Sequence, residues 1–308
     1  LRRDLRLQDN AALFHALQEN KAVQCVFIFD TDILDKLEDE NDARVTFIYQ
    51  EIQRLKKELN ELGGDLWVFY GKPIDIYKNI VEEHPISAVY TNRDYEPYAK
   101  QRDGEIEAFL ADHSIPFKSF KDHVIFEQDE IVKDDGDPYV VYTPYSKKWK
   151  AKLSAKDVES YATEDHFGNL HQTDKTELIT LGEMGFTASK IPFPKRQTTN
   201  GIIRNYEKNR NFPAIQGTSR LSVHFRFGTI SIREKVRKTQ SKSEKWLNEL
   251  IWRDFYSQIL YHFPRIESES FRPQYDAIQW RNNPEEFKAW CEGKTGFPII
   301  DAGMRELN

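Results

Sequence analysis

The pattern of hydrophobic and polar positions divides the chain into a mixed first part and a helical last part. Up to about residue 125, short apolar runs alternate with helical periodicity. The strand-like runs each end at Asp, Gly or Asn and lie at 22–29, 65–71 and 86–92. Helical periodicity covers 42–62 and 73–83, the latter opening on Pro73 at a first helical turn. This alternation predicts βαβ units in an open, mainly parallel, Rossmann-like sheet.

The chain opens on a polar loop rather than on a strand. LRRDLRLQDN occupies 1–10, and a helix is expected from about Asn10. We therefore expect that the first strand of a βα unit is missing. No GxGxxG or GxxxxGK[ST] sequence follows any strand, so the sheet is not expected to hold the main cofactor.

The pattern weakens after residue 125 and becomes helical after Ile202. Residues 126–200 are rich in Pro and charge and predict a long connector, ordered in places by its aromatic side chains. Helix starts are predicted at Thr218 or Ser219, at Ser231 and at Ser243, with a stop at Gly228. The predicted architecture is an α/β domain, a connector and an all-α domain, at 1–125, 126–200 and 201–308.

One segment, WLNELIWRDFY at 246–256, gathers aromatic and charged side chains on one face of a predicted helix. Helical spacing places five of them together: Trp246, Glu249, Trp252, Arg253 and Tyr256. The other side carries apolar residues that account for packing: Leu247, Leu250, Ile251, Phe255 and Ile259. Two indoles, an acid, a guanidinium and a phenol are not typical of solvated surface. The first face therefore predicts the wall of a site for a flat aromatic ligand and an anion.

Composition narrows the class of protein. The 308 residues are 39% hydrophobic with a formal net charge of −6, and the mean hydropathy is −0.70. No apolar run approaches the roughly 18 residues of a membrane span, and the N-terminus does not read as a signal peptide. The negative net charge argues against a protein that binds nucleic acid through its overall charge. If DNA is the partner, the basic residues must be concentrated on one face. Cys25 and Cys291 lie in different halves, which favours the reducing cytoplasm over a disulfide framework.

The segment GTSRLSVHFRFGTISIR at 217–233 is a candidate phosphate cradle. Free N–H groups, the hydroxyls of Thr218 and Ser219 and a helix dipole suit an anion. The alternative is a plain helix cap, the commoner role of Thr and Ser. Arg253 favours the cradle, because its guanidinium can contact phosphate in bidentate fashion.

Three further side chains each have two interpretations. Tyr206 either hydrogen-bonds a ligand or caps a core, and Arg210 either meets DNA phosphate or is a solvated charge. Trp280 is either a core residue, the default, or a member of a chain of redox-active indoles. The eight His show no HxxxH or HExxH arrangement, and GxSxG is absent. No metal site and no nucleophilic catalysis are predicted.

Six segments follow one another in a recognisable order along the chain: RRDLRLQDNAAL near the start, TNRDYEPYAKQRD at 91–103, YTPYSKKWK at 142–150, FPAIQGTSRLSVHFRFGTIS at 212–231, LNELIWRDFY at 247–256 and WCEGKTGFPIIDAGMRELN at 290–308. In sequence and spacing they resemble the photolyase and cryptochrome family, and their pattern is similar to class I cyclobutane pyrimidine dimer photolyases. The resemblance spans essentially the whole chain.

The resemblance implies an α/β antenna domain followed by a helical domain that holds FAD. By position, the first FAD-binding segment corresponds to Tyr206, Thr218, Ser219, Arg220, Leu221 and Ser222. Trp246 and Arg253 correspond to further residues that line the flavin. Trp280 corresponds to the surface end of the tryptophan chain that photoreduces it.

The activity implied is light-driven repair of ultraviolet-damaged DNA, in which an electron passes from excited, reduced FAD to an extruded cyclobutane dimer. Glu249 and Trp252 correspond to the residues that receive the dimer. Trp252 gives it an aromatic wall, and Glu249, protonated in a dry pocket, donates a hydrogen bond to a thymine carbonyl. Arg210 corresponds to an arginine that contacts DNA, and Tyr256 is assigned to the DNA-facing surface. We expect a monomer with no membrane partner and no metal.

The alternative is a cryptochrome-type blue-light photoreceptor with the same FAD pocket and no repair. Glu249 favours repair, because the branch that acts on the other ultraviolet product, and its cryptochrome relatives, usually carry Gln there. A binding module for a nucleotide and a protein partner survives only if the resemblance is set aside.

Two departures from the family pattern matter. Tyr98 and Ala99 replace polar residues of folate-binding relatives, which leaves the antenna chromophore open between folate and deazaflavin types. The resemblance also implies truncation at both ends, without the first strand and the second wall of the lesion pocket. Activity is therefore expected of the longer parent protein.

Overall fold

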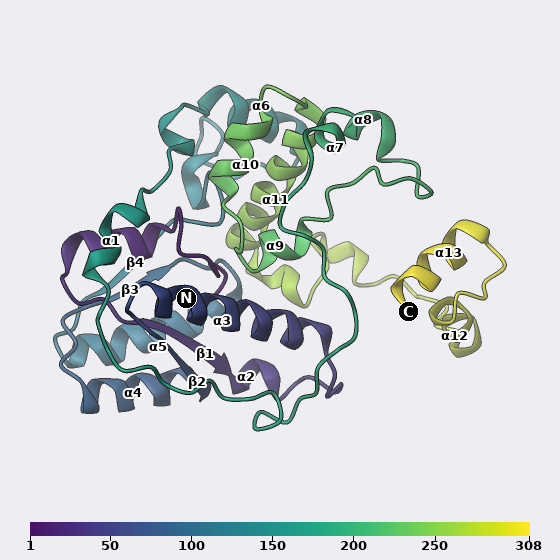
Figure 1. Ribbon diagram of the computed structural model, residues 1–308. Coiled ribbons are helices and arrows are strands. Elements are labelled where there is room, and N and C mark those ends of the chain that lie inside the picture. Colours follow the sequence, from purple (N-terminus) through teal and green to yellow (C-terminus); the bar gives the residue numbers. More distant parts are fainter. The chain divides into compact units, whose positions relative to one another are not determined.

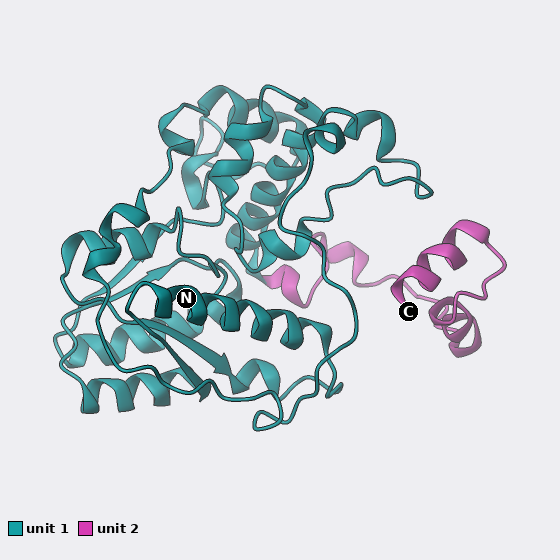
Figure 2. Ribbon diagram, viewed as in Figure 1, with its two compact units in different colours: residues 1–264 teal, residues 265–308 magenta.

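A computed structural model describes residues 1–308 (Figure 1). The chain forms two compact units, Leu1–Pro264 and Arg265–Asn308 (Figure 2). The first unit contains all of the predicted α/β and connector segments and part of the predicted helical segment. The three-segment division drawn from the sequence therefore stays a prediction about domains.

The strands of the first unit form two parallel pairs. β1 (Cys25–Asp30) pairs with β2 (Leu66–Gly71), with Cys25 opposite Leu66, and β3 (Val89–Asn92) pairs with β4 (Phe117–Phe120). Each pair is a separate two-stranded sheet. A crevice of about 210 Å³ lies between them, lined by the side chains of both β1 and β3. The predicted parallel α/β architecture is confirmed, with two strand pairs in place of one continuous sheet.

Helices follow the strands as the periodicity predicts. Those of the α/β part are α1 (Ala11–Glu19), α2 (Thr31–Leu34), α3 (Ala43–Glu61), α4 (Pro73–Glu83) and α5 (Pro97–Asp112). The side chain of Asn10 caps α1 by accepting from the N–H of Leu13 at 3.1 Å. α4 and α5 begin at Pro, whose missing N–H is not needed in a first turn.

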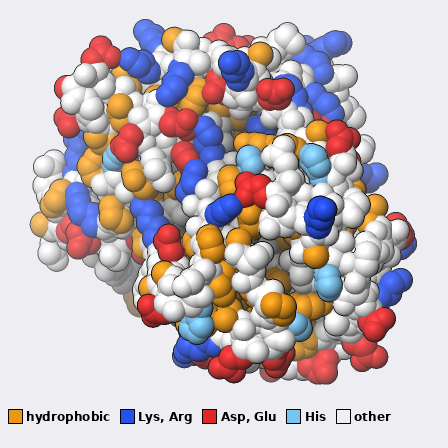
Figure 3. Space-filling model, turned by 90° about the vertical axis from the view of Figure 1, so that its left-hand side faces the viewer, with side chains coloured by type: hydrophobic (Ala, Val, Ile, Leu, Met, Phe, Trp, Pro, Cys, Tyr) orange, Lys and Arg blue, Asp and Glu red, His pale blue; other side chains and the backbone are white.

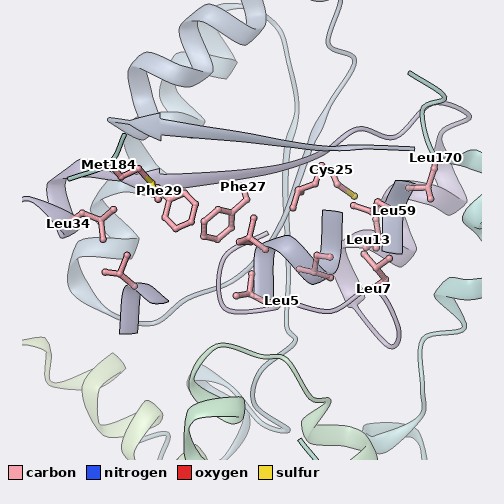
Figure 4. Close-up of a cluster of buried hydrophobic side chains, with 14 of the residues drawn as sticks. Leu5, Leu7, Leu13, Cys25, Phe27, Phe29, Leu34, Leu59, Leu170 and Met184 are labelled. Atoms are coloured by element: carbon pink, nitrogen blue, oxygen red, sulfur yellow. The ribbon is translucent and has the colours of Figure 1, made fainter. Parts of the chain in front are cut away.

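The main core lies against β1 and β2 (Figure 4). Phe27 and Phe29 of β1 pack there with leucines of α1 and α3. Leu170, Met184 and Phe186 of the predicted connector are buried in the same cluster. This stretch of the connector therefore covers the α/β core, and its apolar side chains order it.

The helical part of the first unit is built around one long helix. Its elements are η1 (Gln128–Glu130), α6 (Tyr142–Lys152), η2 (Lys156–Val158), η3 (Thr163–Asn169), α7 (Asn200–Arg204), α8 (Tyr206–Asn209), α9 (Ser222–Arg226), α10 (Ile232–Thr239) and α11 (Glu244–His262). The predicted starts at Ser231 and Ser243 are confirmed, because these side chains accept from the N–H groups of Glu234 and Trp246.

The predicted start at Thr218 or Ser219 is wrong. α9 begins only at Ser222, because Arg220 adopts a left-handed backbone with φ 51° and interrupts the helical path. The predicted stop at Gly228 is confirmed, with φ 61°. A Cβ at Gly228 would lie 1.8 Å from the carbonyl oxygen of Arg3, so only glycine allows the N-terminal loop to approach here.

The second unit is a small helical segment. After η4 (Pro264–Glu267) at the junction come η5 (Pro273–Tyr275), α12 (Pro284–Cys291) and α13 (Pro298–Leu307). Asp301 organises its turn by accepting from the N–H groups of Thr295 at 2.7 Å and Gly296 at 3.0 Å. No helix of either unit is long and apolar enough to cross a membrane.

Charged side chains of both signs are mixed on the surface, and four of them form a cluster in the interior. Acidic and basic side chains are interspersed over the face drawn in Figure 3. Inside the first unit, Arg6, Asp9, Asp122 and Arg233 are each no more than 6% exposed. Asp122 accepts from Arg6 at 2.8 Å and from Arg233 at 2.9 Å, and Arg233 also donates to Asp9 at 2.8 Å. This buried charge cluster joins the N-terminal loop, the segment after β4 and the start of α10.

We predict that Asp122→Asn lowers the free energy of unfolding by about 3 to 5 kcal/mol, because it leaves two buried guanidinium groups without a counter-charge. The two arginines also hold the pKa of Asp122 below its usual range, so this stability is present above pH 4 and lost as the carboxylate protonates. Urea unfolding at neutral pH measures the change. Asp134→Asn is the control: its ion pair with Lys148 is exposed to solvent, so we expect a much smaller change in the free energy of unfolding. Equal effects of the two substitutions would contradict the assignment.

Candidate functional site

The largest cavity that combines charged and aromatic walls has a volume of about 520 Å³ and lies wholly within the first unit. It opens between α11, the segment from Tyr206 to Arg226 and the loops at 94–96 and 123. Its walls are Arg3, Asp94, Tyr95, Glu96, His123, Tyr206, Thr218, Ser219, Leu221, Ser222, Phe225, Arg226, Trp246, Glu249, Leu250, Arg253, Tyr256, Ser257 and Leu260.

α11 supplies the side of the cavity predicted from its helical spacing, with one exception. Trp246, Glu249, Arg253 and Tyr256 line the cavity. Trp252 does not; it lies at the edge of that face and stacks on Tyr142 of α6, with ring centroids 3.6 Å apart. The predicted apolar face is buried, and Leu250 also reaches the cavity.

The predicted phosphate cradle is a loop and not a helix end. Thr218, Ser219, Leu221 and Ser222 line the cavity, while Arg220 is not among its walls. α9 behind them has five residues, too short for a strong helix dipole. The hydroxyl groups can therefore act as hydrogen-bonding partners, but the dipole contribution expected from the sequence is not available.

Arg253 holds the back of the cavity together. It donates to the backbone carbonyl oxygens of His123 and, at 3.2 Å, of Phe225. Burial lowers the pKa of Arg253, and burial together with this guanidinium lowers the pKa of His123 to about 4. The cavity thus has a neutral imidazole at pH 7. Two of the five N–H groups of Arg253 serve these carbonyls, so the phosphate contact expected of this guanidinium would use the remaining three and stays a prediction.

Glu249 and Arg210 form an ion pair at the rim of the cavity. The guanidinium of Arg210 also makes a cation–π contact with Tyr206, at 5.4 Å from the centroid of the ring. The side chain of Glu249 is thus occupied by Arg210, so the hydrogen bond to a thymine carbonyl that the family resemblance implies requires Arg210 to move away first. Trp280 lies in the second unit and is 70% exposed, which argues against its interpretation as a core residue.

Several walls of the cavity were not found from the sequence. Phe225 and Arg226 belong to the 217–233 segment, which was interpreted from its hydroxyl side chains alone. Arg3, Asp94 and Glu96 come from the α/β part, and Arg3 forms ion pairs with both acids, at 3.1 Å to Asp94. The resemblance segments at the N-terminus and at 91–103 contain them, but nothing local in the sequence links them to α11.

A second cavity of about 250 Å³ lies at the end of β1. Its walls include Phe27, Phe29 and Tyr98, with the guanidinium groups of Arg44 and Arg102. The hydroxyl of Tyr98 donates to Asp30 at 2.6 Å. The two cavities share a wall made of Arg3, Asp94, Glu96 and Arg226.

The position of α11 relative to its neighbours depends on Asp254, which is 1% exposed. Its carboxylate accepts from the N–H groups of Ile125 and Phe126, at 3.0 and 3.2 Å, and from the indole of Trp149 at 3.0 Å. Burial raises the pKa of Asp254 to about 6, although the guanidinium of Arg253 and these donors act in the other direction. Asp254 ties α11 to α6 and to the segment after β4.

The first cavity fits a flavin better than a metal ion. Trp246 and Phe225 provide flat apolar walls, and the hydroxyls of Thr218, Ser219 and Ser222 suit the polar part of a dinucleotide. Its volume falls within the range of about 300 to 1,000 Å³ of small-molecule sites. No group of three or more His, Cys, Asp or Glu side chains is placed to hold a metal ion.

Together the fold and the cavity define a protein with an α/β part, a helical part and a candidate flavin site. Comparison with protein families agrees: residues 1–163 match the model described as DNA photolyase, and 246–308 match the FAD binding domain of DNA photolyase. The chain is 33% identical to the deoxyribodipyrimidine photo-lyase of Synechococcus sp., over 99% of this chain and 69% of that protein. It is 31% identical to that of Halobacterium salinarum, over 99% of this chain and 70% of that protein. The chain therefore belongs to the DNA photolyase family.

Solved structures share this fold. An archaeal photolyase from Sulfolobus tokodaii, described with two FAD molecules, has a TM-score of 0.81 and 31% identity, over 100% of this chain and 69% of that one. A cryptochrome from Synechocystis sp. has a TM-score of 0.83 over 100% of this chain and 70% of that one, and its 20% identity shows the fold alone. The family resemblance and the photolyase fold predicted from the sequence are confirmed.

We predict that the stability of the protein relative to an Asp254→Asn variant falls as pH rises from 4 to 6. The raised pKa of Asp254 means that the folded state holds a proton that the unfolded state releases, so the contribution is fully present below about pH 4 and is lost as pH rises through about 6. The expected change is on the order of 2 kcal/mol. Urea unfolding of both proteins at half-unit pH steps measures it. A difference that stays constant with pH would contradict the raised pKa.

Proposed function

We propose that the protein binds FAD in the 520 Å³ cavity and uses light to split cyclobutane pyrimidine dimers in ultraviolet-damaged DNA. The observation that carries this proposal is the arrangement of α11, which lines the flavin cavity with Trp246 and Arg253 and places Glu249 at its rim. The names of the relatives and the match to the FAD binding domain support the same conclusion. The chemistry that FAD supplies when bound is the light-driven transfer of one electron to the dimer and its return.

The residues of this chain would bind and orient the reacting groups. Trp246, Phe225 and Leu221 would hold the flat ring system, with Thr218, Ser219, Ser222 and Tyr206 as polar partners. Arg220 is retained as a candidate FAD contact from the family pattern alone. Trp280, exposed in the second unit, would be reachable by a one-electron reductant in solution, such as a thiol, which would supply the electron needed for flavin photoreduction.

The lesion would enter beside Glu249 and Trp252. An extruded dimer is less well stacked than a normal base pair, so its removal from the duplex costs less, and Trp252 would offer it an aromatic surface. Glu249 would hydrogen-bond the pyrimidine edge once Arg210 turns to a DNA phosphate. Tyr256, 63% exposed, would contact the DNA strand. Action as a monomer in the cytoplasm stays a prediction from the sequence.

The second cavity is our candidate binding site for an antenna chromophore. Aromatic walls and the arginines Arg44 and Arg102 suit a flat ligand with an anionic group. The wall shared with the first cavity would place the two chromophores close together, as energy transfer requires. This geometry does not discriminate a folate from a deazaflavin.

We predict that the protein with reduced FAD restores the 260 nm absorbance of an oligonucleotide carrying one cyclobutane thymine dimer under blue light, and not in the dark. Glu249→Ala is expected to lower the repair rate at saturating light by about tenfold or more, because a hydrogen bond to a charged intermediate is lost. Lys245→Ala, an exposed position on the same helix, is the control. Dimers that persist under light, while the flavin spectrum responds, would favour the photoreceptor alternative.

We predict that the purified holoprotein has an absorption band besides that of FAD, and that Tyr98→Ala reduces this band by more than half. The substitution removes an aromatic wall of the second cavity and its hydrogen bond to Asp30. The FAD band in the same sample is the internal control. A second band that survives Tyr98→Ala unchanged would place the antenna elsewhere.

A further inference from the structure

Tyr142 and Trp252 form the closest ring stack of the molecule. Their centroids are 3.6 Å apart and their planes differ by 4°. Tyr142 is the first residue of α6, and Trp252 lies in the middle of α11, 110 positions later. One face of the Trp252 indole is therefore covered by a side chain from another helix. The ring of Tyr256, one turn further along α11, also lies nearly parallel to the indole, with centroids 5.4 Å and planes 24° apart.

The phenol is fixed by the turn of helix that carries the indole. The hydroxyl of Tyr142 donates to the backbone oxygen of Asn248 at 3.0 Å. Asn248 precedes Trp252 by four residues, so the same oxygen is the helical acceptor for the N–H of Trp252. Burial, with the nearby charge of Glu249, raises the pKa of Tyr142 to about 12, so this hydroxyl remains a donor at neutral pH.

The stack lies at the border between core and surface. Tyr145, Trp149 and Phe255 of the same two helices are buried, whereas Tyr142 and Trp252 are only partly so. The ring of Phe255 meets both edge-on, at 5.9 Å from Tyr142 and 5.6 Å from Trp252. A partly exposed indole held between the stacked rings of Tyr142 and Tyr256 and the edge-on ring of Phe255 has little rotamer freedom left to lose when a flat ligand binds.

We propose that Tyr142 is a positioning residue that fixes the plane of Trp252 for stacking against the pyrimidine dimer. The proposal rests on the proposed function, in which Trp252 receives the dimer. Tyr142 itself does not touch the lesion. Its ring sets the orientation of the indole. The hydrogen bond from its hydroxyl to Asn248 holds the ring of Tyr142 at a fixed position on α11.

The test compares Tyr142→Leu, which removes the stack, with Tyr142→Phe, which keeps the ring and loses only the hydroxyl. Binding is measured in the dark to one oligonucleotide with a single cyclobutane thymine dimer and to the same sequence undamaged. We expect Tyr142→Leu to reduce the ratio of the two affinities about 3- to 10-fold and Tyr142→Phe to retain it. Tyr139→Leu is the matched control, since this partly buried tyrosine contacts Tyr145 and not Trp252.

A second readout does not depend on DNA. Acrylamide quenching of tryptophan fluorescence is measured in each variant, and the contribution of Trp252 is obtained by difference from a Trp252→Phe background. We expect Tyr142→Leu, and not Tyr139→Leu, to raise the quenching constant of Trp252 about twofold.

The outcomes separate the two proposals. Tyr142→Leu with the affinity ratio of the unaltered protein, or with both affinities lowered equally, would overturn the positioning role. An unaltered protein that binds damaged and undamaged DNA equally would overturn the proposed function instead. In that case the fluorescence readout still decides whether Tyr142 orients Trp252.

Discussion

The buried charge cluster of Arg6, Asp9, Asp122 and Arg233 is the constraint on which the rest of the first unit depends. Each guanidinium donates to the carboxylate of Asp122, so removal of any member leaves a charge without compensation in a dry interior. The cluster joins three stretches that are distant in sequence. It thereby brings the loop with Arg3 and the segment with His123 against α11, where both line the cavity that we propose for the flavin.

The side chains of α11 make contacts with different parts of the first unit. Trp246 and Arg253 face the cavity, Asp254 anchors the helix to α6 and to the segment after β4, and Trp252 stacks on Tyr142. Because residues three and four apart share a helix face, one rigid element can hold the proposed flavin contacts and the proposed lesion contact at a constant separation. The proposed repair chemistry requires such a fixed geometry, since the protein's contribution is position and electrostatics.

Local sequence patterns predicted most of the helix and strand bounds correctly. They were wrong where contacts with distant segments determine the backbone conformation. The strand at 65–71 and the helix at 42–62 appear within a residue or so, as Leu66–Gly71 and Ala43–Glu61, because their periodicity is a property of the segment itself. The helix start at Thr218 was wrong because Gly217 packs on the carbonyl of Asn209, where a Cβ would lie 2.7 Å from the oxygen, and Arg220 takes a left-handed backbone. Neither effect has a signal in a short window of sequence.

The sequence by itself determined the family, the parallel α/β part followed by helices, and the aromatic and charged face of α11, because side-chain periodicity and ordered motifs are local properties of a chain. Only the tertiary structure decided which of those side chains meet. It paired Arg210 with Glu249, turned Arg253 to two backbone carbonyls and covered one face of Trp252 with Tyr142. Such contacts depend on distances between segments as much as 130 residues apart, and those distances are set by the packing of the whole unit.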